Sequence, residues 1–160
     1  MQELPHTHDC FVCGESNACG LRLRFHTDGT TVRTEFTPRP EHVGFRNTIH
    51  GGIISTILDE IMVWACAVRT KQFGYCVEMT VRFQRPLRPG VTAVATAELV
   101  SNRKDRLFEA RGEIRDGDTV LATATGKYFA LKPSETRAFL PDLVGDLSFL
   151  QCAPGAQPEP

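Results

Sequence analysis

Residues 50–68 read HGGIISTILDEIMVWACAV, and the rest of the chain must be arranged around this stretch. Nearly every position after the two glycines is apolar or small, which predicts a helix over 54–68 that is buried on most sides. Two adjacent carboxylates, Asp59 and Glu60, interrupt the apolar run. An ionised carboxylate in a core is strongly unfavourable unless it is paired or hydrogen-bonded. We therefore expect at least one of them to be functional, with a purely structural pairing of Asp59 as the alternative.

Helical geometry separates the residues of this stretch into two arcs, since each residue advances by about 100°. The wide apolar arc, which needs a sheet to cover it, holds Ile53, Ile54, Ile57, Leu58, Ile61, Trp64, Ala65 and Val68. The mixed arc, which suits a cleft or a second subunit, holds Ser55, Thr56, Asp59, Glu60, Val63 and Cys66. Asp59 lies near the middle of the mixed arc and Glu60 towards its edge.

The start of the helix has the features of a carbonyl-binding site. Gly51 and Gly52 have no side chain to cap the first turn, so we expect unsatisfied N–H groups there. Positive partial charge collects at a helix N-terminus, and the missing Cβ atoms allow a carbonyl or an anion to approach closely. A polarising helix end near a carboxylate is a layout found in active sites.

Composition places the chain among ordinary globular proteins. Its 160 residues, 41% hydrophobic and 23% charged, suit one domain with a sizeable core. A formal net charge of -1 gives no footprint for nucleic-acid binding. The N-terminus shows no apolar leader, and no apolar run approaches the ~18 residues that span a membrane. We expect a cytoplasmic protein without nucleic-acid or membrane partners.

Three of the six cysteines, Cys10, Cys13 and Cys19, cluster in the first 20 residues together with two histidines. Such a set supplies the ligand types of a zinc site, but a usual zinc signature has two well-separated ligand pairs. The C-x-x-C pair also allows redox chemistry, although it does not open a predicted helix. We expect a metal-free packed loop, with zinc or redox chemistry as the alternatives.

Period-two alternation of apolar and polar residues predicts strands on both sides of the helix. A hairpin with a turn at Asp28-Gly29 precedes the helix, and a meander follows it. The predicted strands span 21–27, 31–37, 74–87, 91–102, 106–117 and 119–131. This order predicts an α+β fold, an antiparallel sheet curled around a single helix.

The chain is expected to divide into a Cys/His-containing segment over 1–20, the main domain over 21–133 and a C-terminal extension over 134–160. A short amphipathic segment after Pro133 predicts a helical piece on the outside. The end, APGAQPEP, is rich in proline and glycine and is expected to form a disordered tail.

Taken together, HGGIISTILDE, the strand YCVEMTVRFQRPL and the following Pro-Gly turn resemble the hotdog-fold thioesterases of the phenylacetate-degradation (PaaI-like) type. The likeness extends over residues 21–131 through the order of the strands. The leading CFVCGESNACGLRLRF resembles a subgroup of the same superfamily. The resemblance implies a hotdog fold, in which a curled antiparallel sheet wraps one long helix.

The resemblance also implies a set of catalytic groups. The N–H of Gly51 or Gly52 would polarise a thioester carbonyl, and Asp59 would act as nucleophile or as general base on water. His50 would orient the loop and the carbonyl. Because some hotdog enzymes use a glutamate on this helix, Glu60 is a rival to Asp59, which the spacing favours.

Two positions depart from the pattern of the family. Related enzymes have Ser or Thr early on the strand after the helix, where this chain has Cys76. Relatives often have Asn six residues before the histidine, where this chain has Gly44, and Asn47 is nearer but out of register. Cys76 and Asn47 are therefore candidates for substrate contacts.

The resemblance implies an acyl-CoA substrate, coenzyme A as the leaving thiol, no required cofactor or metal, and a homodimer or homotetramer with active sites between subunits. A non-catalytic acyl-CoA binding or sensing domain on the same scaffold is the main alternative. A hotdog dehydratase is a weaker one, since His50 is followed by Gly-Gly.

Overall fold

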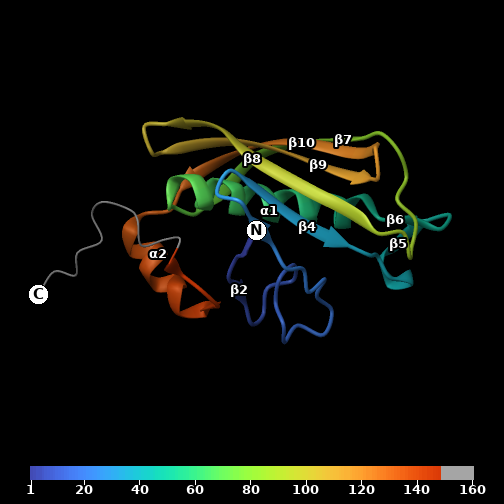
Figure 1. Ribbon diagram of the computed structural model, residues 1–160, viewed down its shortest axis with the longest axis horizontal. Helices are drawn as coiled ribbons and strands as arrows, with labels where there is room; N and C mark the ends of the chain where they lie inside the picture. The colour runs from blue at the N-terminus through green and yellow to red at the C-terminus, as the bar shows by residue number, and fades with distance from the viewer. Residues whose placement is uncertain (149–160) are drawn as a thin grey trace, which may run out of the picture.

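The computed structural model describes residues 1–148. Its main element is a seven-stranded antiparallel sheet (Figure 1). In spatial order the strands are β1 (Gln2–Glu3), β3 (His26–Thr27), β4 (Thr31–Phe36), β8 (Ala93–Arg103), β9 (Leu107–Asp116), β10 (Thr119–Ala130) and β7 (Gly74–Phe83). Residues 149–160, which include the predicted tail, lie outside the described residues.

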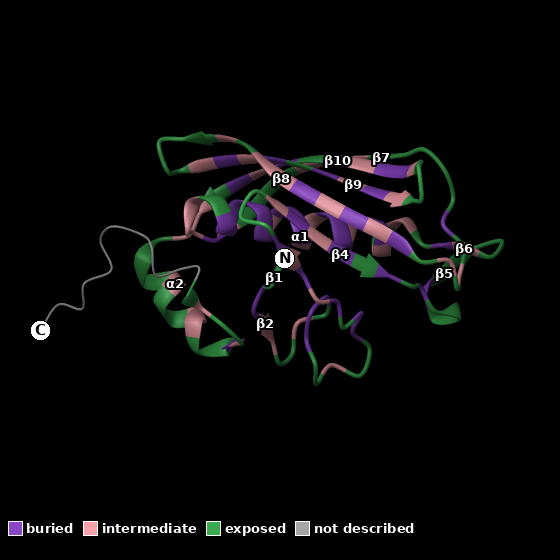
Figure 2. Ribbon diagram, in the orientation of Figure 1, coloured by how far each residue is buried: buried purple, intermediate pink, exposed green. Residues whose placement is uncertain are grey.

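One long helix, α1 (Gly51–Thr70), lies across the concave face of this sheet and contacts β4, β7, β8, β9 and β10. Half of its 20 residues are buried, as Figure 2 shows in purple. Small residues on the sheet let the helix come close: Ala95 and Ala97 are buried on β8, and Gly112 on β9 faces Leu58 and Met62. This arrangement is the hotdog fold that the resemblance implied.

The helix has the length and apolarity of a membrane-spanning segment, with a mean hydropathy of 1.6. Its apolar residues are nevertheless largely covered by the sheet, as expected for a core helix. Cys66, which the arc analysis placed among the mixed residues, is fully buried. The helix ends at Thr70, and the next residue, Lys71, adopts the left-handed conformation with φ 63°.

The predicted meander is confirmed, with small differences at the strand ends. The strand after the helix ends at Phe83, four residues earlier than predicted, because the segment that follows contains Pro86 and Pro89. The other three strands begin and end within two residues of the predicted bounds.

The first predicted strand, 21–27, is shorter than expected, since only His26–Thr27 joins the sheet. Arg22 has φ 55°, which breaks the extended run. The N–H groups of Leu21 and Leu23 instead donate to the carbonyls of Phe11 and Val12. The alternation of apolar residues over 21–27 thus reflects burial against the N-terminal segment, and most of this stretch does not join the sheet.

The N-terminal segment covers the face of α1 that points away from the sheet (Figure 1). Its residues Leu4, Val12 and Cys13 are buried in the common core. A two-stranded ladder joins its β2 (His6–Thr7) to β11 (Leu143–Val144). Another joins β5 (Val43–Phe45) to β6 (Thr48–Ile49), just before α1. The predicted helical piece begins with α2 (Pro133–Phe139).

Candidate active site

Asp59 lies on α1 and is held by the sheet. The hydroxyl of Tyr128, on β10, donates a hydrogen bond of 3.1 Å to Oδ1 of Asp59 and lies 3.4 Å from its backbone carbonyl. Tyr128 is fully buried. Burial, and then the nearby charge of Asp59, raise the pKa of this phenol well above its usual range. Tyr128 is therefore a neutral donor that fixes one oxygen of the carboxylate.

Cys76, on β7, is the second neighbour of Asp59. Partial burial raises the pKa of its thiol to about 11, and the charge of Asp59 and a hydrogen bond to it act in the same direction. The structure thus brings two of the predicted site residues, Asp59 and Cys76, together. It adds Tyr128, which the sequence analysis missed, because no local pattern connects a strand tyrosine with a helix carboxylate 69 residues away.

Glu60 faces a different environment, because adjacent helix residues point about 100° apart. Its Oε1 accepts from the thiol of Cys13 at 3.5 Å and lies 3.9 Å from Sγ of Cys10. Burial raises the pKa of Glu60 to about 7, and the nearby Cys10 contributes to the rise. The two rival carboxylates are therefore separated, with Asp59 towards the sheet and Glu60 towards the N-terminal segment.

The first turn of α1 is capped, contrary to the expectation from its two glycines. Nδ1 of His50 accepts a hydrogen bond of 2.8 Å from the N–H of Gly52. The carbonyl of His50 accepts from Ile53 at 2.9 Å. Within residues 1–148, the N–H of Gly51 has no acceptor. Of the two predicted amides, only that of Gly51 is available to a substrate.

A pocket of about 360 Å³ opens at this end of the helix. Gly51, Ile54, Phe83, Arg85 and Leu87 are among the residues that line it. A Cβ atom on Gly51 would lie 3.2 Å from the ring of Phe83, so the glycine leaves room for the aromatic wall. The pocket therefore combines an available amide, an apolar wall and one guanidinium group.

Gly44 and Asn47 have structural explanations. A Cβ atom on Gly44 would lie 2.9 Å from Cδ2 and 3.0 Å from Cα of His50, so the asparagine of relatives does not fit this backbone without a shift. Asn47 is exposed in the turn between β5 and β6, with φ 57°, and Arg46 before it has φ 44°. Two successive positive φ angles are typical of the turn that closes a two-stranded ladder.

The N-terminal cysteines are only partly brought together. Cys10 and Cys13 meet Glu60, whereas Cys19 is exposed and lies outside this group. His6 and His8 both pair with Glu15, at 3.1 and 2.9 Å. The three cysteines of the zinc alternative, Cys10, Cys13 and Cys19, are thus not the set that the fold gathers.

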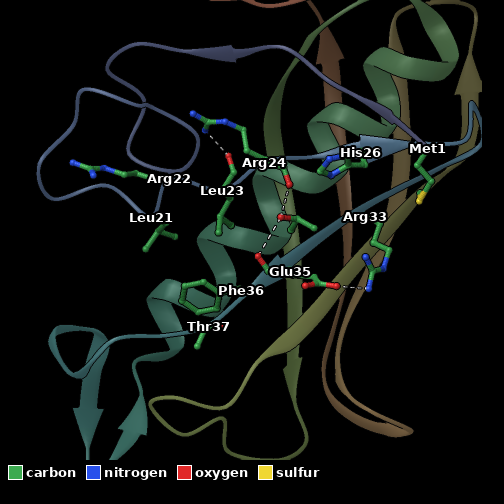
Figure 3. A pocket seen from close by; sticks show the side chains of 11 residues that line it. Met1, Leu21, Arg22, Leu23, Arg24, His26, Arg33, Glu35, Phe36 and Thr37 are labelled. Atoms are coloured by element: carbon green, nitrogen blue, oxygen red, sulfur yellow. Dashed lines mark hydrogen bonds and ion pairs between the residues drawn. The ribbon is translucent and has the colours of Figure 1, made fainter.

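A larger pocket, of about 600 Å³, lies between β4 and the segment 21–26 (Figure 3). Arg22, Arg24 and Arg33 line it, and Arg33 is paired with Glu35 at 2.8 Å. None of the predicted site residues lines this pocket. The smaller pocket at the start of α1 is therefore the better candidate for the reacting group.

A segment of the chain matches a known protein family. Residues 46–123 match the family model of the thioesterase superfamily. This segment, just under half of the chain, is similar to the thioesterase superfamily. The matched segment contains His50, both glycines, Asp59 and Cys76, whereas Tyr128 lies beyond it. No curated protein matches the chain at a significant level.

Solved structures show the same fold. A thioesterase superfamily protein is 26% identical with a TM-score of 0.68, and the match covers 77% of this chain and 60% of that one. This chain therefore spans less than two thirds of that relative. The PaaI protein from the phenylacetic acid degradation operon of E. coli is 22% identical, covers 74% and 87%, and has a TM-score of 0.66. A Streptococcus mutans protein bound to acetyl-CoA is 14% identical, covers 68% and 88%, and has a TM-score of 0.63.

Proposed function

We propose that the protein is an acyl-CoA thioesterase in which Asp59 is the working carboxylate and Gly51 supplies the amide that polarises the thioester carbonyl. One observation carries the proposal: the Asp59 carboxylate is fixed by the buried Tyr128 hydroxyl, on the helix whose first amide is available at a pocket. The match of residues 46–123 to the thioesterase superfamily and the acetyl-CoA bound by a protein of the same fold support the substrate class.

In this proposal, each active site takes its Gly51 amide from one subunit and its Asp59 carboxylate from the other. Asp59 follows Gly51 by eight positions, which separates them by about 12 Å along a helix that rises 1.5 Å per residue. Reacting atoms must approach to about 3–3.5 Å. A carbonyl held by Gly51 is therefore beyond the reach of Asp59 on the same helix, and Asp59 of the partner subunit attacks.

Strand β7 is the edge through which a second copy would pair. It ends the sheet next to β10, so one of its sides lacks a neighbouring strand among residues 1–148. Its side chains include Tyr75, Val77 and Phe83, which are 63%, 50% and 58% exposed. An unpaired edge with exposed apolar side chains favours pairing with another strand. Pairing of two β7 strands supports a homodimer, from which a tetramer could be built.

The reaction follows from these positions. The thioester oxygen accepts a hydrogen bond from the N–H of Gly51, where positive partial charge at the helix end stabilises the developing oxyanion. The carboxylate of Asp59 removes a proton from an attacking water and passes it to the leaving sulfur. Alternatively, it attacks the carbonyl itself and forms an anhydride, which a water then hydrolyses while supplying the proton of the thiol. The C–S bond then breaks, coenzyme A leaves as the thiol, and the acyl group leaves as the acid. Arg85 provides a cation in the pocket for an anionic part of the substrate.

Thiol release from short, medium, long and aryl acyl-CoA substrates tests the proposal. The wild-type protein is compared with Asp59→Asn, Glu60→Gln and, as a matched change at an exposed carboxylate, Asp116→Asn. We expect Asp59→Asn to lose at least about 10³-fold in kcat, because the attacking group is removed. Asp116→Asn is expected to retain wild-type activity, and Glu60→Gln to lose far less than Asp59→Asn.

Each other outcome has a definite meaning. If Glu60→Gln loses activity and Asp59→Asn keeps it, Glu60 is the working carboxylate and our assignment is wrong. If no substrate releases thiol but acyl-CoA raises the melting temperature, the protein is a binding module. If neither occurs, the proposed substrate class is wrong.

A further inference from the structure

The fold places two cysteines of the N-terminal segment next to one glutamate of α1. Cys10 and Cys13 precede Glu60 by 50 and 47 positions, yet their sulfur atoms and the Glu60 carboxylate all lie within 4.8 Å of one another. Cys13 is buried, and Cys10 and Glu60 are partly buried. The segment that brings the cysteines lies over the face of α1 opposite the sheet (Figure 1).

A carboxylate with little access to water is costly unless it is hydrogen-bonded or a cation neutralises it, and two thiolates beside it would add to that cost. No lysine, arginine or histidine of residues 1–148 forms an ion pair with Glu60. Its partners are the two thiols and the side chain of Trp64. Arg24 is nearby, but its guanidinium donates to the backbone carbonyl of Cys13 at 2.8 Å. No cation among residues 1–148 therefore neutralises the Glu60 carboxylate.

The spacing of the three groups fits a thiolate-binding metal ion. With Zn–S near 2.3 Å and Zn–O near 2.1 Å at a tetrahedral angle, a sulfur and an oxygen on one zinc ion lie about 3.6 Å apart. Glu60 Oε1 is 3.5 Å from Sγ of Cys13 and 3.9 Å from Sγ of Cys10. Both distances agree with common ligation, and only small side-chain movements are needed.

We propose that Cys10, Cys13 and Glu60 bind a Zn²⁺ ion that fastens the N-terminal segment to α1. Two thiolates and one carboxylate supply three ligands, and a water takes the fourth position of the tetrahedron. Cys19 is excluded because it is exposed and outside the group, and His6 and His8 are paired with Glu15. Binding displaces the protons of both thiols, so the affinity falls as pH falls.

The site is distinct from the proposed reacting groups. Glu60 points towards the N-terminal segment, whereas Asp59, its neighbour in sequence, is held by Tyr128 on the sheet. The ion would therefore act on the docking of residues 1–20 and on stability, and its presence is measured independently of thioester hydrolysis.

Metal content of the full-length protein tests the proposal. Protein purified with a non-thiol reductant is stripped, incubated with Zn²⁺, desalted and analysed by elemental mass spectrometry. We expect about one equivalent of zinc per chain. Cys10→Ser, Cys13→Ser and Glu60→Gln are each expected to retain less than about a tenth of an equivalent, since each removes one of three ligands. Cys19→Ser and His8→Ala serve as matched controls and retain the full equivalent.

Cobalt substitution in the wild-type protein keeps the test valid if a variant misfolds. Bound Co²⁺ is expected to show a thiolate-to-metal charge-transfer band and the intense visible bands of tetrahedral coordination. The proposal is wrong if reduced wild-type protein takes up no zinc, or if Cys19→Ser or His8→Ala loses the ion as completely as Cys10→Ser. A full equivalent in folded Glu60→Gln would also overturn the assignment of Glu60. Formation of a Cys10–Cys13 disulfide in air, without zinc uptake from reduced protein, would instead support the redox alternative.

Discussion

The hydroxyl of Tyr128 lies 3.1 Å from Oδ1 of Asp59, and this hydrogen bond connects the penultimate strand of the sheet to the central helix. Because Tyr128 is fully buried, its hydroxyl cannot exchange this hydrogen bond for one to bulk water. The bond fixes one oxygen of the Asp59 carboxylate. Asp59 thus faces the sheet, whereas Oε1 of Glu60 accepts a hydrogen bond from the thiol of Cys13 on another side of the helix.

Replacing Tyr128 with phenylalanine is expected to lower kcat by about tenfold, because it removes one hydrogen bond that positions Asp59. The free energy of unfolding should fall by about 1–2 kcal/mol, since a partly buried carboxylate loses a donor. Steady-state kinetics and urea unfolding measure the two effects. Thr37→Val, which removes an exposed side-chain hydrogen bond to Thr92, is the control. Unchanged kcat in folded Tyr128→Phe would show that the bond does not position the catalytic group.

Replacing Gly51 with proline removes one N–H while preserving the helix, because proline is favoured at the first helical position. His50 before it has φ -59° and ψ 132°, a conformation that a following proline accepts. We expect kcat to fall by about 10²–10³-fold, as for loss of one oxyanion donor. Gly51→Ala adds a Cβ against the same Phe83 ring but keeps the N–H, so it should lose much less. Equal losses in both variants would place the effect in packing and not in the amide.

Mixing Gly51→Pro with Asp59→Asn subunits distinguishes a shared site from a single-chain site. In a heterodimer, one of the two shared sites combines an intact Gly51 amide with an intact Asp59. Random re-pairing of equal amounts should therefore restore about a quarter of wild-type activity. The control is each variant unfolded and refolded alone. Activity that never exceeds the sum of the two variants would contradict the assignment of the two groups to different subunits.

Cys76 is expected to react slowly with alkylating agents despite its exposure. Its pKa of about 11 leaves only about one thiolate in a thousand at pH 8, and the rate should rise about tenfold per pH unit until pH exceeds that value. Asp59→Asn removes the charge that contributes to the raised pKa, so the rate at pH 8 should increase several-fold. Peptide mass spectrometry at successive times gives the rate, with Cys19 as the internal control. An identical rate in Asp59→Asn would show that the two side chains do not interact.

Gly44→Ala is expected to destabilise the start of α1. The new Cβ would lie 3.0 Å from Cα of His50, a backbone atom that cannot move without shifting the cap. Overpacking of this kind costs about 1–3 kcal/mol, and thermal unfolding measures it as a lower melting temperature. Glu41→Ala, an exposed substitution in the same loop, should change stability by less than about 0.5 kcal/mol. A Gly44→Ala protein as stable as wild type would show that this backbone accommodates a Cβ atom at position 44.

The order of elements and the fold class could be predicted from the sequence, because they depend on local periodicity. The apolar run after Gly52 predicts a core helix, and alternation over 119–131 predicts a strand wherever it pairs. The same reasoning failed for 21–25. There the alternation of Leu21, Leu23 and Phe25 reflects burial, while the positive φ of Arg22 and hydrogen bonds to the N-terminal segment prevent a continuous strand.

The sequence by itself determined that Asp59 and Glu60 are adjacent on a buried helix and that glycines begin it. Only the tertiary structure decided which groups surround each carboxylate, because a helix fixes the angle between neighbours but not what lies opposite them. Tyr128 and Cys76 reach Asp59, and Cys10 and Cys13 reach Glu60, through contacts between distant parts of the chain. The availability of the Gly51 amide likewise depended on the orientation of the His50 ring, which satisfies Gly52 instead.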